Sequence, residues 1–93
     1  MKEIKHLNGP SKGVFRLMVD GEERGFMSYA WAGESRFIID HTIVHPGNQG
    51  QGYGKELVAA GVEFARQEGV KIIPLCPFAK AVIEKNPDYR DVL

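Results

Sequence analysis

The stretch Gln49-Gly50-Gln51-Gly52-Tyr53-Gly54 joins a strand-like segment, residues 38–44, to an amphipathic helical segment. Its glycines fall at every second position, so successive backbone N–H groups are not covered by Cβ atoms. A helix N-terminus also carries positive potential, and together these features can hold phosphate groups without basic side chains. The alternative is a glycine-rich turn that only lets the helix pack closely on a sheet.

The spacing of this loop differs from two common phosphate-binding motifs. A dinucleotide fingerprint has the pattern G-x-G-x-x-G, and in a Walker loop the final lysine is followed by serine or threonine. Here the pattern is Q-x-x-G-x-G, with Gln49, Gly52 and Gly54 at its defined places, and Lys55 is followed by Glu56. The loop therefore predicts a phosphate site of a third kind.

The composition limits the classes of protein to which the chain can belong. Its 93 residues predict one domain spanning residues 1–93, and this small size is compatible with a monomer. The 12 basic and 12 acidic residues cancel, so neither nucleic acid nor an anionic membrane is an expected partner. No apolar run approaches the roughly 20 residues that span a bilayer. A single cysteine predicts no internal disulfide and a reducing, cytoplasmic location.

Several strands are predicted ahead of the glycine loop. Alternating apolar residues and short turns mark three of them, over residues 13–19, 25–31 and 36–44. Asp20-Gly21 is a strong hairpin signal between the first two. Consecutive strands joined by short turns predict an antiparallel meander. Residues 2–6 form either a short additional strand or a loose lead-in.

Helices and one more strand are predicted after the loop. A helix is expected over residues 51–67, with apolar side chains on one arc and charged side chains opposite, and Gly69 ends it as a C-cap. The apolar segment 70–75 follows, and a helical crossover of this length predicts that it runs parallel to the third strand. A second helix begins directly after Cys76, its N-cap, and residues 88–93 form a tail that can pack back as one turn. The predicted fold class is α+β.

Cys76 and His41 are the candidate catalytic residues. A cysteine at a helix N-terminus faces uncovered N–H groups, which favour the thiolate and lower the thiol pKa. His41 is predicted on the neighbouring parallel strand, on the side of Ile39 and Ile43, where its imidazole can act as the base for the thiol. The alternatives are a buried apolar cysteine and a core histidine bonded to the backbone. The cysteine and the three histidines lack the paired spacing of metal ligands, so no metal is expected.

The order of the predicted elements, taken with the loop, resembles the GNAT superfamily of acetyltransferases, which bind acetyl-coenzyme A. The family signature Q/R-x-x-G-x-G/A is matched by Gln49, Gly52 and Gly54. Two further segments, Asp40-His41-Thr42 and Pro74-Leu75-Cys76-Pro77-Phe78, resemble the small single-domain GNAT-like N-acetyltransferases of the YjdJ type. The similarity covers nearly the whole chain.

This resemblance implies a minimal GNAT-like fold with a coenzyme A site. The loop amides hold the pyrophosphate at the helix N-terminus. The third strand and the parallel strand pair at one end and splay at the other, and the pantetheine arm lies in the gap against the strand backbone. The residues implied to bind the coenzyme are Ile43, Val44, Gln49, Gly50, Gln51, Gly52, Tyr53 and Gly54. Acetyl-coenzyme A is the implied co-substrate, and the acceptor is an amine or thiol of a small molecule or a protein.

Two departures from full-length members of the family bear on function. The chain lacks the long helices between the first two strands that shape the acceptor site, so an open acceptor side is expected. The last helix has no tyrosine to protonate the departing thiolate, and Tyr89 lies beyond it. Acetyl transfer is expected either directly, with His41 or a water as base, or through an acetylated Cys76. The alternatives to an enzyme are a coenzyme A-binding sensor or carrier and a scaffold that has kept only the fold.

Overall fold

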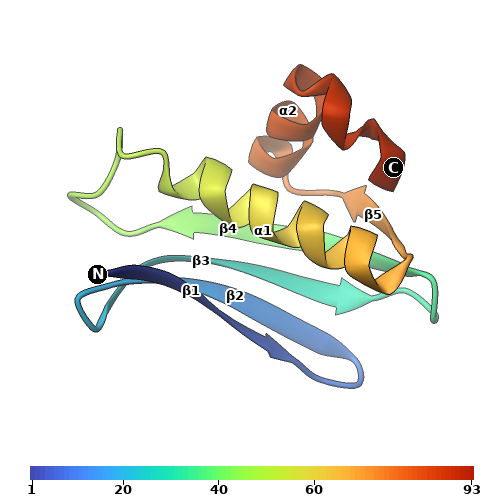
Figure 1. Ribbon diagram of the computed structural model, residues 1–93, viewed down its shortest axis with the longest axis horizontal. Coiled ribbons are helices and arrows are strands. Elements are labelled where there is room, and N and C mark those ends of the chain that lie inside the picture. Colours follow the sequence, from blue (N-terminus) through green and yellow to red (C-terminus); the bar gives the residue numbers. More distant parts are fainter.

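The computed structural model describes residues 1–93 and contains a five-stranded sheet with strand order β1-β2-β3-β4-β5 (Figure 1). The first four strands are antiparallel neighbours, and β5 runs parallel to β4. The predicted α+β class and the meander are therefore confirmed. The strands are β1 Lys2–Asn8, β2 Lys12–Val19, β3 Glu22–Trp31, β4 Arg36–Val44 and β5 Lys71–Pro74, and the helical segments are α1 Tyr53–Glu68, α2 Pro77–Lys85 and the 3-10 helix η1 Pro87–Val92.

The N-terminal segment, for which the sequence left two possibilities, is a full strand. β1 pairs with β2 along its whole length, from Lys2 to Asn8. The hairpin between β2 and β3 turns at Asp20 and Gly21, whose φ angles of 52° and 84° are both positive, as a tight hairpin turn requires. β1 and β5 are consequently the two edges of the sheet.

β4 is paired with β5 over only its first half. The parallel ladder runs from Arg36 opposite Lys71 to Ile39 opposite Pro74 and then stops. From the next residue onward, β4 has β3 on one side and no strand on the other. The chain leaves β5 toward α2 instead, so a gap opens beside the second half of β4. The splay that the resemblance implied between these strands is present.

Two β-bulges decide which side chains face each side of the sheet. The pairing register shifts beside Arg24 in β3 and beside Asp40 in β4. One extra residue in a strand moves the following side chains to the opposite face. Ile39 is buried under the helices, and the next residue on that side is Thr42 rather than His41. The prediction that His41 shares the face of Ile39 is wrong for this reason.

α1 begins at Tyr53, two residues later than the sequence predicted. Gly50 and Gly52 have φ angles of 83° and 78°, which lie outside the helical range, and Gly52 is the N-cap. The loop therefore enters the helix through two left-handed glycines. At the other end, Gly69 adopts the left-handed conformation with a φ of 67° and is the predicted C-cap.

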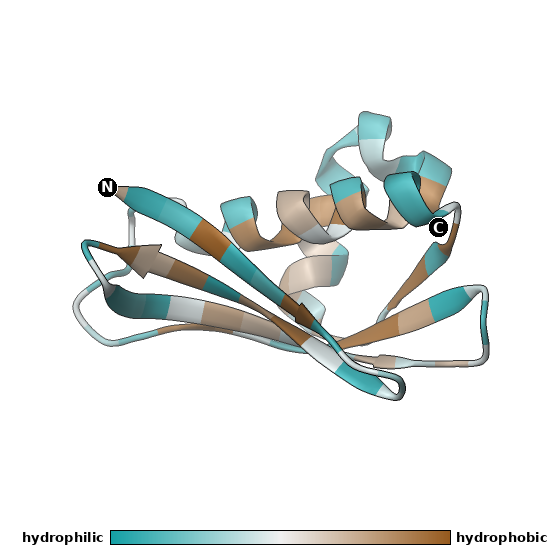
Figure 2. Cartoon of the chain, turned by 60° about the horizontal axis from the view of Figure 1, so that its bottom comes forward, coloured by the Kyte–Doolittle hydropathy of each residue, from teal (hydrophilic) through white to brown (hydrophobic).

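α1 packs lengthwise on the sheet and supplies the centre of the core. Figure 2 shows α1, α2 and η1 on one side of the sheet, so no helix covers its other face. We call that uncovered side the bare face. The core of α1 and the sheet consists of Leu57, Val58, Val62 and Ala65 packed with Leu17, Met27, Tyr29, Phe37 and Ile39.

The C-terminal residues pack back on the core as the sequence predicted, in the form of η1. Val92 is 2% exposed and belongs to the core cluster. Arg66 of α1 pairs with Asp91 of η1, with Nε and Oδ2 2.9 Å apart. These contacts hold α2 beside the gap, because η1 follows it directly. No helix of the chain has both the length and the apolar character needed to cross a bilayer.

Tyr29 lies in an aromatic cluster of the core and carries a hydrogen-bonded hydroxyl. The hydroxyl donates to Asn8 Oδ1 at 2.8 Å and lies 2.6 Å from His6 Nε2. Because its proton is directed to Asn8, the hydroxyl accepts its other hydrogen bond from the His6 ring. Burial raises the pKa of Tyr29 to about 12, so the residue remains a neutral phenol near pH 7.

Replacing Tyr29 by phenylalanine is expected to lower the free energy of unfolding by about 1–2 kcal/mol. The substitution keeps the ring and removes the partner of the His6 N–H. Asn8 Oδ1 still accepts from Trp31 Nε1 at 2.9 Å, which limits the loss. Urea unfolding at neutral pH measures the effect, and an unchanged midpoint would show that the hydroxyl contributes nothing to stability.

Candidate functional site

An open groove lies between the loop that precedes α1 and the start of α2. Its volume is about 720 Å³. The groove is lined by the six loop residues 49–54 together with Thr42, Val44, Asn48, Lys55 and Phe78. The structure thus brings together the loop residues and Val44, which the sequence singled out. Ile43 is the one member of the predicted coenzyme set that does not line the groove.

The loop carries a continuous row of free backbone N–H groups. No N–H from Gln49 to Lys55 donates a hydrogen bond to a protein atom. The last three of these residues form the first turn of α1, where helix geometry leaves N–H groups without partners. No protein atom lies within 4 Å of a Cβ added at Gly50 or Gly52, so the space above them is open. Free donors facing open space fit an anion such as a pyrophosphate.

The backbone of β4 offers hydrogen-bonding groups to the gap at Thr42 and Val44. The His45 N–H bonds to Arg24 O at 2.9 Å, so the polar groups of His45 face β3. The backbone N–H and C=O groups of successive residues point alternately to the two sides of a strand. The backbone groups of Ile43 therefore also face β3, whereas those of Thr42 and Val44 face the gap. The prediction that the Ile43 backbone is free to extend the sheet is therefore wrong. The backbone groups that face the gap beside Val44 are those of Thr42 instead.

Cys76 lies at the point where β4 and β5 separate. Its N–H bonds to Ile39 O at 3.0 Å, which extends the contact between the two strands by one bond. Cys76 is the N-cap of α2, as predicted, and is 7% exposed. Its Sγ lies 3.6 Å from Thr42 Oγ1 on β4. Thr42 therefore connects the thiol to the groove.

The pKa of the Cys76 thiol is lowered from its ordinary value. Burial is the largest influence and by itself raises the pKa. The amide of Ala79, the hydroxyl and amide of Thr42 and the amide of Phe78 act in the opposite direction and together outweigh burial. The thiolate fraction near neutral pH is therefore larger than for an ordinary cysteine.

Replacing Thr42 by valine is expected to raise the pKa of Cys76, because the substitution removes a hydroxyl that stabilises the thiolate and keeps the side-chain volume. Only the thiolate reacts with iodoacetamide. The variant should therefore be alkylated more slowly than the wild type at pH 7, and the two rates should converge at high pH. Alkylation reactions are quenched at set times, and intact-mass spectrometry then gives the rate for each protein at each pH. The Cys76→Ala variant is the control that cannot be alkylated at this position. If the two rate profiles coincide at every pH, the Thr42 hydroxyl does not influence the pKa of Cys76.

His41 does not approach Cys76. It lies opposite Ser28 of β3 on the bare face and is exposed. The bulge at Asp40 turns it there, and Asp40 Oδ1 accepts a hydrogen bond from Ser28 Oγ at 2.5 Å. The prediction that the imidazole acts as the base for the thiol is therefore wrong, since the two groups lie on opposite sides of β4.

Phe78 is a groove residue that the sequence reasoning missed. A Cβ added at Gly54 would lie 2.7 Å from Phe78 Cζ. A larger residue at the third glycine of the loop would therefore displace the ring of Phe78, which lies against it. The available signal was the position of Phe78 two residues after Cys76, in a segment already singled out. Thr42, Asn48 and Lys55 were missed as groove residues as well.

Neither Tyr89 nor a metal-binding cluster belongs to the groove. Tyr89 lies in η1, near the guanidinium of Arg66 at 5.9 Å, and does not line the groove. No group of three histidine, cysteine, aspartate or glutamate side chains is placed to hold a metal ion. The groups that the site offers are the loop amides, the Thr42 hydroxyl with the Cys76 thiol beside it, and the polar side chains of the lining, which are Asn48, Gln49, Gln51, Tyr53 and Lys55.

A glycine loop with free amides at a helix N-terminus, beside two splayed parallel strands, is typical of an acyltransferase that uses coenzyme A. A family model described as GCN5-related N-acetyl-transferase matches residues 14–92. The chain therefore belongs to the GCN5-related N-acetyltransferase (GNAT) family, and the resemblance seen in the sequence is confirmed. No curated protein matches the chain.

The solved structures to which the chain is similar include acetyltransferases and candidate acetyltransferases. A GCN5-like candidate N-acetyltransferase from Staphylococcus aureus is 38% identical over 97% of this chain and 85% of that chain, with a TM-score of 0.73. A candidate streptothricin acetyltransferase from Bacillus anthracis, in complex with acetyl coenzyme A, is 18% identical over 74% and 40%, with a TM-score of 0.63. An N-acetylglutamate synthase from Neisseria gonorrhoeae, complexed with coenzyme A and N-acetyl-glutamate, is 25% identical over 78% and 18%, with a TM-score of 0.64.

Proposed function

We propose that this chain is an N-acetyltransferase that transfers an acetyl group from acetyl-coenzyme A to an amine or thiol acceptor. The observation that carries the proposal is the row of unpartnered amides from Gln49 to Lys55, which lines a groove reaching Thr42, the neighbour of Cys76. Membership of the GNAT family supports it. The structures of two more distant relatives hold acetyl coenzyme A or coenzyme A.

The residues of the groove fit this coenzyme. The free loop amides would hold the pyrophosphate, and Gly50 and Gly52 present it a surface without side chains. Lys55 adds a positive charge to the lining. The backbone groups of Thr42 and Val44 face the gap, where the amide-bearing pantetheine arm can add to β4 like an extra strand. The bound coenzyme supplies an activated acetyl thioester.

The bare face is the proposed approach for the acceptor, and His41 is the candidate base there. His41 is exposed and follows directly along β4 from the bulge, on the opposite side of the strand from the thiol. Phe26 and Ile43 pair with each other beside it on the same face. A neutral imidazole can accept the proton that an attacking amine must lose.

Cys76 supports a second route to the same product. Its Sγ forms a bond to the acetyl carbonyl carbon while the carbon–sulfur bond of the coenzyme thioester breaks and expels a thiolate. The acceptor amine then attacks the acetyl carbon of acetylated Cys76, loses its proton to water, and releases the Cys76 thiolate. Because this route needs a reduced thiol, we place the protein in the reducing cytoplasm.

A coenzyme A-binding sensor or carrier without robust turnover is the second candidate function. Two observations favour it. Cys76 is only 7% exposed, so an acceptor has little direct access to the thiol from solvent. The last helix also supplies no tyrosine to protonate a departing thiolate.

Incubation with acetyl-coenzyme A is expected to add one acetyl group to the protein at Cys76, seen by intact mass, and the Cys76→Ala variant should gain none. With a panel of amines and thiols, the wild type should release free coenzyme A thiol, and Cys76→Ala should be slower by about tenfold or more. Full turnover by Cys76→Ala would assign the reaction to direct transfer.

The same measurements separate the candidate functions. Binding without release of free thiol from any acceptor favours the sensor or carrier. Calorimetric titration with acetyl-coenzyme A comes first, because it shows whether the chain binds the coenzyme at all. A chain that binds none is neither an enzyme of this class nor a sensor.

A further inference from the structure

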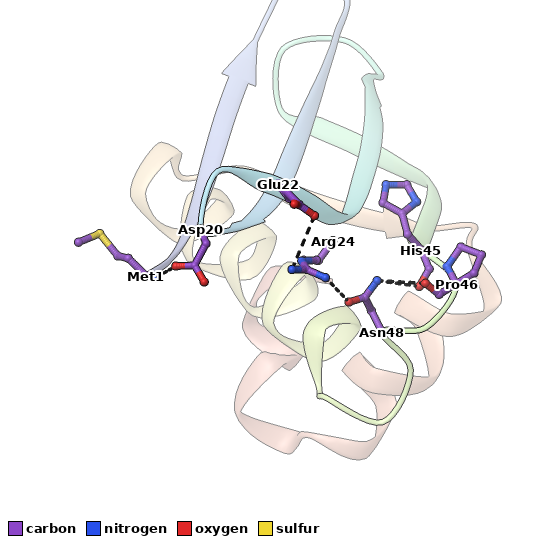
Figure 3. A network of polar contacts seen from close by, with 7 residues as sticks. All are labelled: Met1, Asp20, Glu22, Arg24, His45, Pro46 and Asn48. Carbon is purple, nitrogen blue, oxygen red and sulfur yellow. Dashed lines mark hydrogen bonds and ion pairs between the residues drawn. The ribbon is translucent and has the colours of Figure 1, made fainter.

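The turn that leads into the amide-bearing loop is anchored by two consecutive residues of β3. Glu23 and Arg24 lie where a β-bulge shifts the register of β3 against β2. A bulge adds one residue and redirects the side chains beside it. Glu23 Oε2 lies 2.6 Å from His45 Nε2, and Arg24 Nη1 donates to Asn48 Oδ1 at 3.2 Å. The two side chains thus reach the two ends of the turn 45–48, and Figure 3 shows the contact made by Arg24.

Asn48 passes this contact on to the backbone of the turn. Its Nδ2 donates to the carbonyl oxygens of His45 and Pro46, each at 3.2 Å, and its N–H bonds to His45 O at 3.1 Å. Both ends of the side-chain amide are therefore engaged immediately before Gln49, the first residue of the free-amide row. Asn48 lines the groove, whereas Arg24 does not.

The position of Arg24 is costly for a guanidinium. Its side chain is 33% exposed, and its Nε is buried without a hydrogen-bond partner. Glu22 Oε2 lies 3.7 Å from Nη2, which is longer than a normal hydrogen bond (Figure 3). A buried donor without a partner lowers stability. The hydrogen bond that the guanidinium does make goes to Asn48.

We propose that Arg24 is a positioning residue for coenzyme binding, which acts through Asn48 on the free amides that begin at Gln49. The proposal rests on the proposed function of the groove. Arg24 holds Asn48, Asn48 holds the turn, and the turn sets the direction in which Gln49 enters the loop. A row of amides grips a pyrophosphate only when its N–H groups converge on the same volume, so loosening the turn weakens the grip.

The affinity for coenzyme A, measured by isothermal titration calorimetry, is expected to fall about tenfold in Arg24→Ala. Pantetheine lacks the pyrophosphate, so its binding, followed by the amide resonances of β4, should be unchanged. Arg36→Ala is the matched control, because Arg36 is an exposed arginine at the start of β4, outside the groove. It should bind coenzyme A like the wild type. Arg24→Lys keeps the charge and loses the forked donors, and should recover only part of the affinity.

A double-mutant cycle separates positioning from direct contact. In an Asn48→Ala background, Arg24→Ala should cause no further loss, because Arg24 acts through Asn48. Additive losses, or equal losses for coenzyme A and pantetheine, would overturn the proposal. If Arg24→Ala does not fold, Arg24→Lys alone and combined with Asn48→Ala gives the same comparison. Absence of binding by the wild type would remove the proposed function, whereas tight binding by both wild type and Arg24→Ala would overturn this proposal alone.

Discussion

The Gly52→Ala variant is expected to bind coenzyme A about a hundredfold more weakly than the wild type and to remain folded. Gly52 is the N-cap of α1, with a φ of 78°, and no protein atom lies within 4 Å of a Cβ added there. The added methyl group would stand in the open space through which a phosphate reaches the loop amides. The left-handed backbone itself costs alanine about 1–2 kcal/mol of stability.

Gly33→Ala is the matched control for this variant. Gly33 lies in the turn between β3 and β4, has a φ of 77°, and also has nothing within 4 Å of an added Cβ. The two substitutions therefore carry the same backbone strain, and thermal denaturation should show similar losses. Titration calorimetry should show that only Gly52→Ala loses coenzyme affinity. If both variants bind as tightly as the wild type, the loop is not the phosphate site.

The Gly13→Ala variant is expected to lose about 3 kcal/mol of unfolding free energy. Its added Cβ would overlap the ring of Tyr29 and would lie 2.7 Å from the backbone oxygen of Leu7. Tyr29 is 1% exposed and Leu7 is paired within the sheet, so neither can move away cheaply. The whole stability of a small domain is only about 5–15 kcal/mol, so the loss is a large fraction of it. Urea unfolding at neutral pH measures it.

A double variant tests the origin of that loss. Tyr29→Leu opens space beside Gly13 at the cost of core contacts. If the ring is the obstacle, Gly13→Ala combined with Tyr29→Leu should be more stable than the sum of the two single losses predicts. Strictly additive losses would show that the ring and the added methyl group do not meet.

Several features of the fold could be predicted because they depend on residues close together in the chain. Positive φ angles at Asp20 and Gly21 form the predicted hairpin turn, and Gly69 ends α1 as the predicted C-cap. The apolar period of residues 51–67 predicted which arc of α1 is buried. The helix start was misplaced by two residues, because Gly52 adopts the left-handed conformation and is the N-cap, so that the helix begins at Tyr53.

The candidate site was predicted less completely. The loop residues and Cys76 were found from local chemistry, and the structure places them around one groove and its inner end. The pairing of His41 with Cys76 failed because the bulge at Asp40 adds one residue to β4. A side-chain period of two cannot be counted through an insertion that the sequence does not mark. The same insertion brought Thr42 to the thiol.

By itself, the sequence determined the kinds of elements, their order and the glycine loop, because backbone freedom and apolar period are properties of a few neighbouring residues. Only the tertiary structure decided which side chains meet: Thr42 with Cys76, Phe78 with Gly54, and Arg24 with Asn48. Each pair joins residues more than twenty positions apart, which meet only when strands, turns and helices pack on one another. Register is set by the packing of the whole sheet, and one inserted residue reverses it.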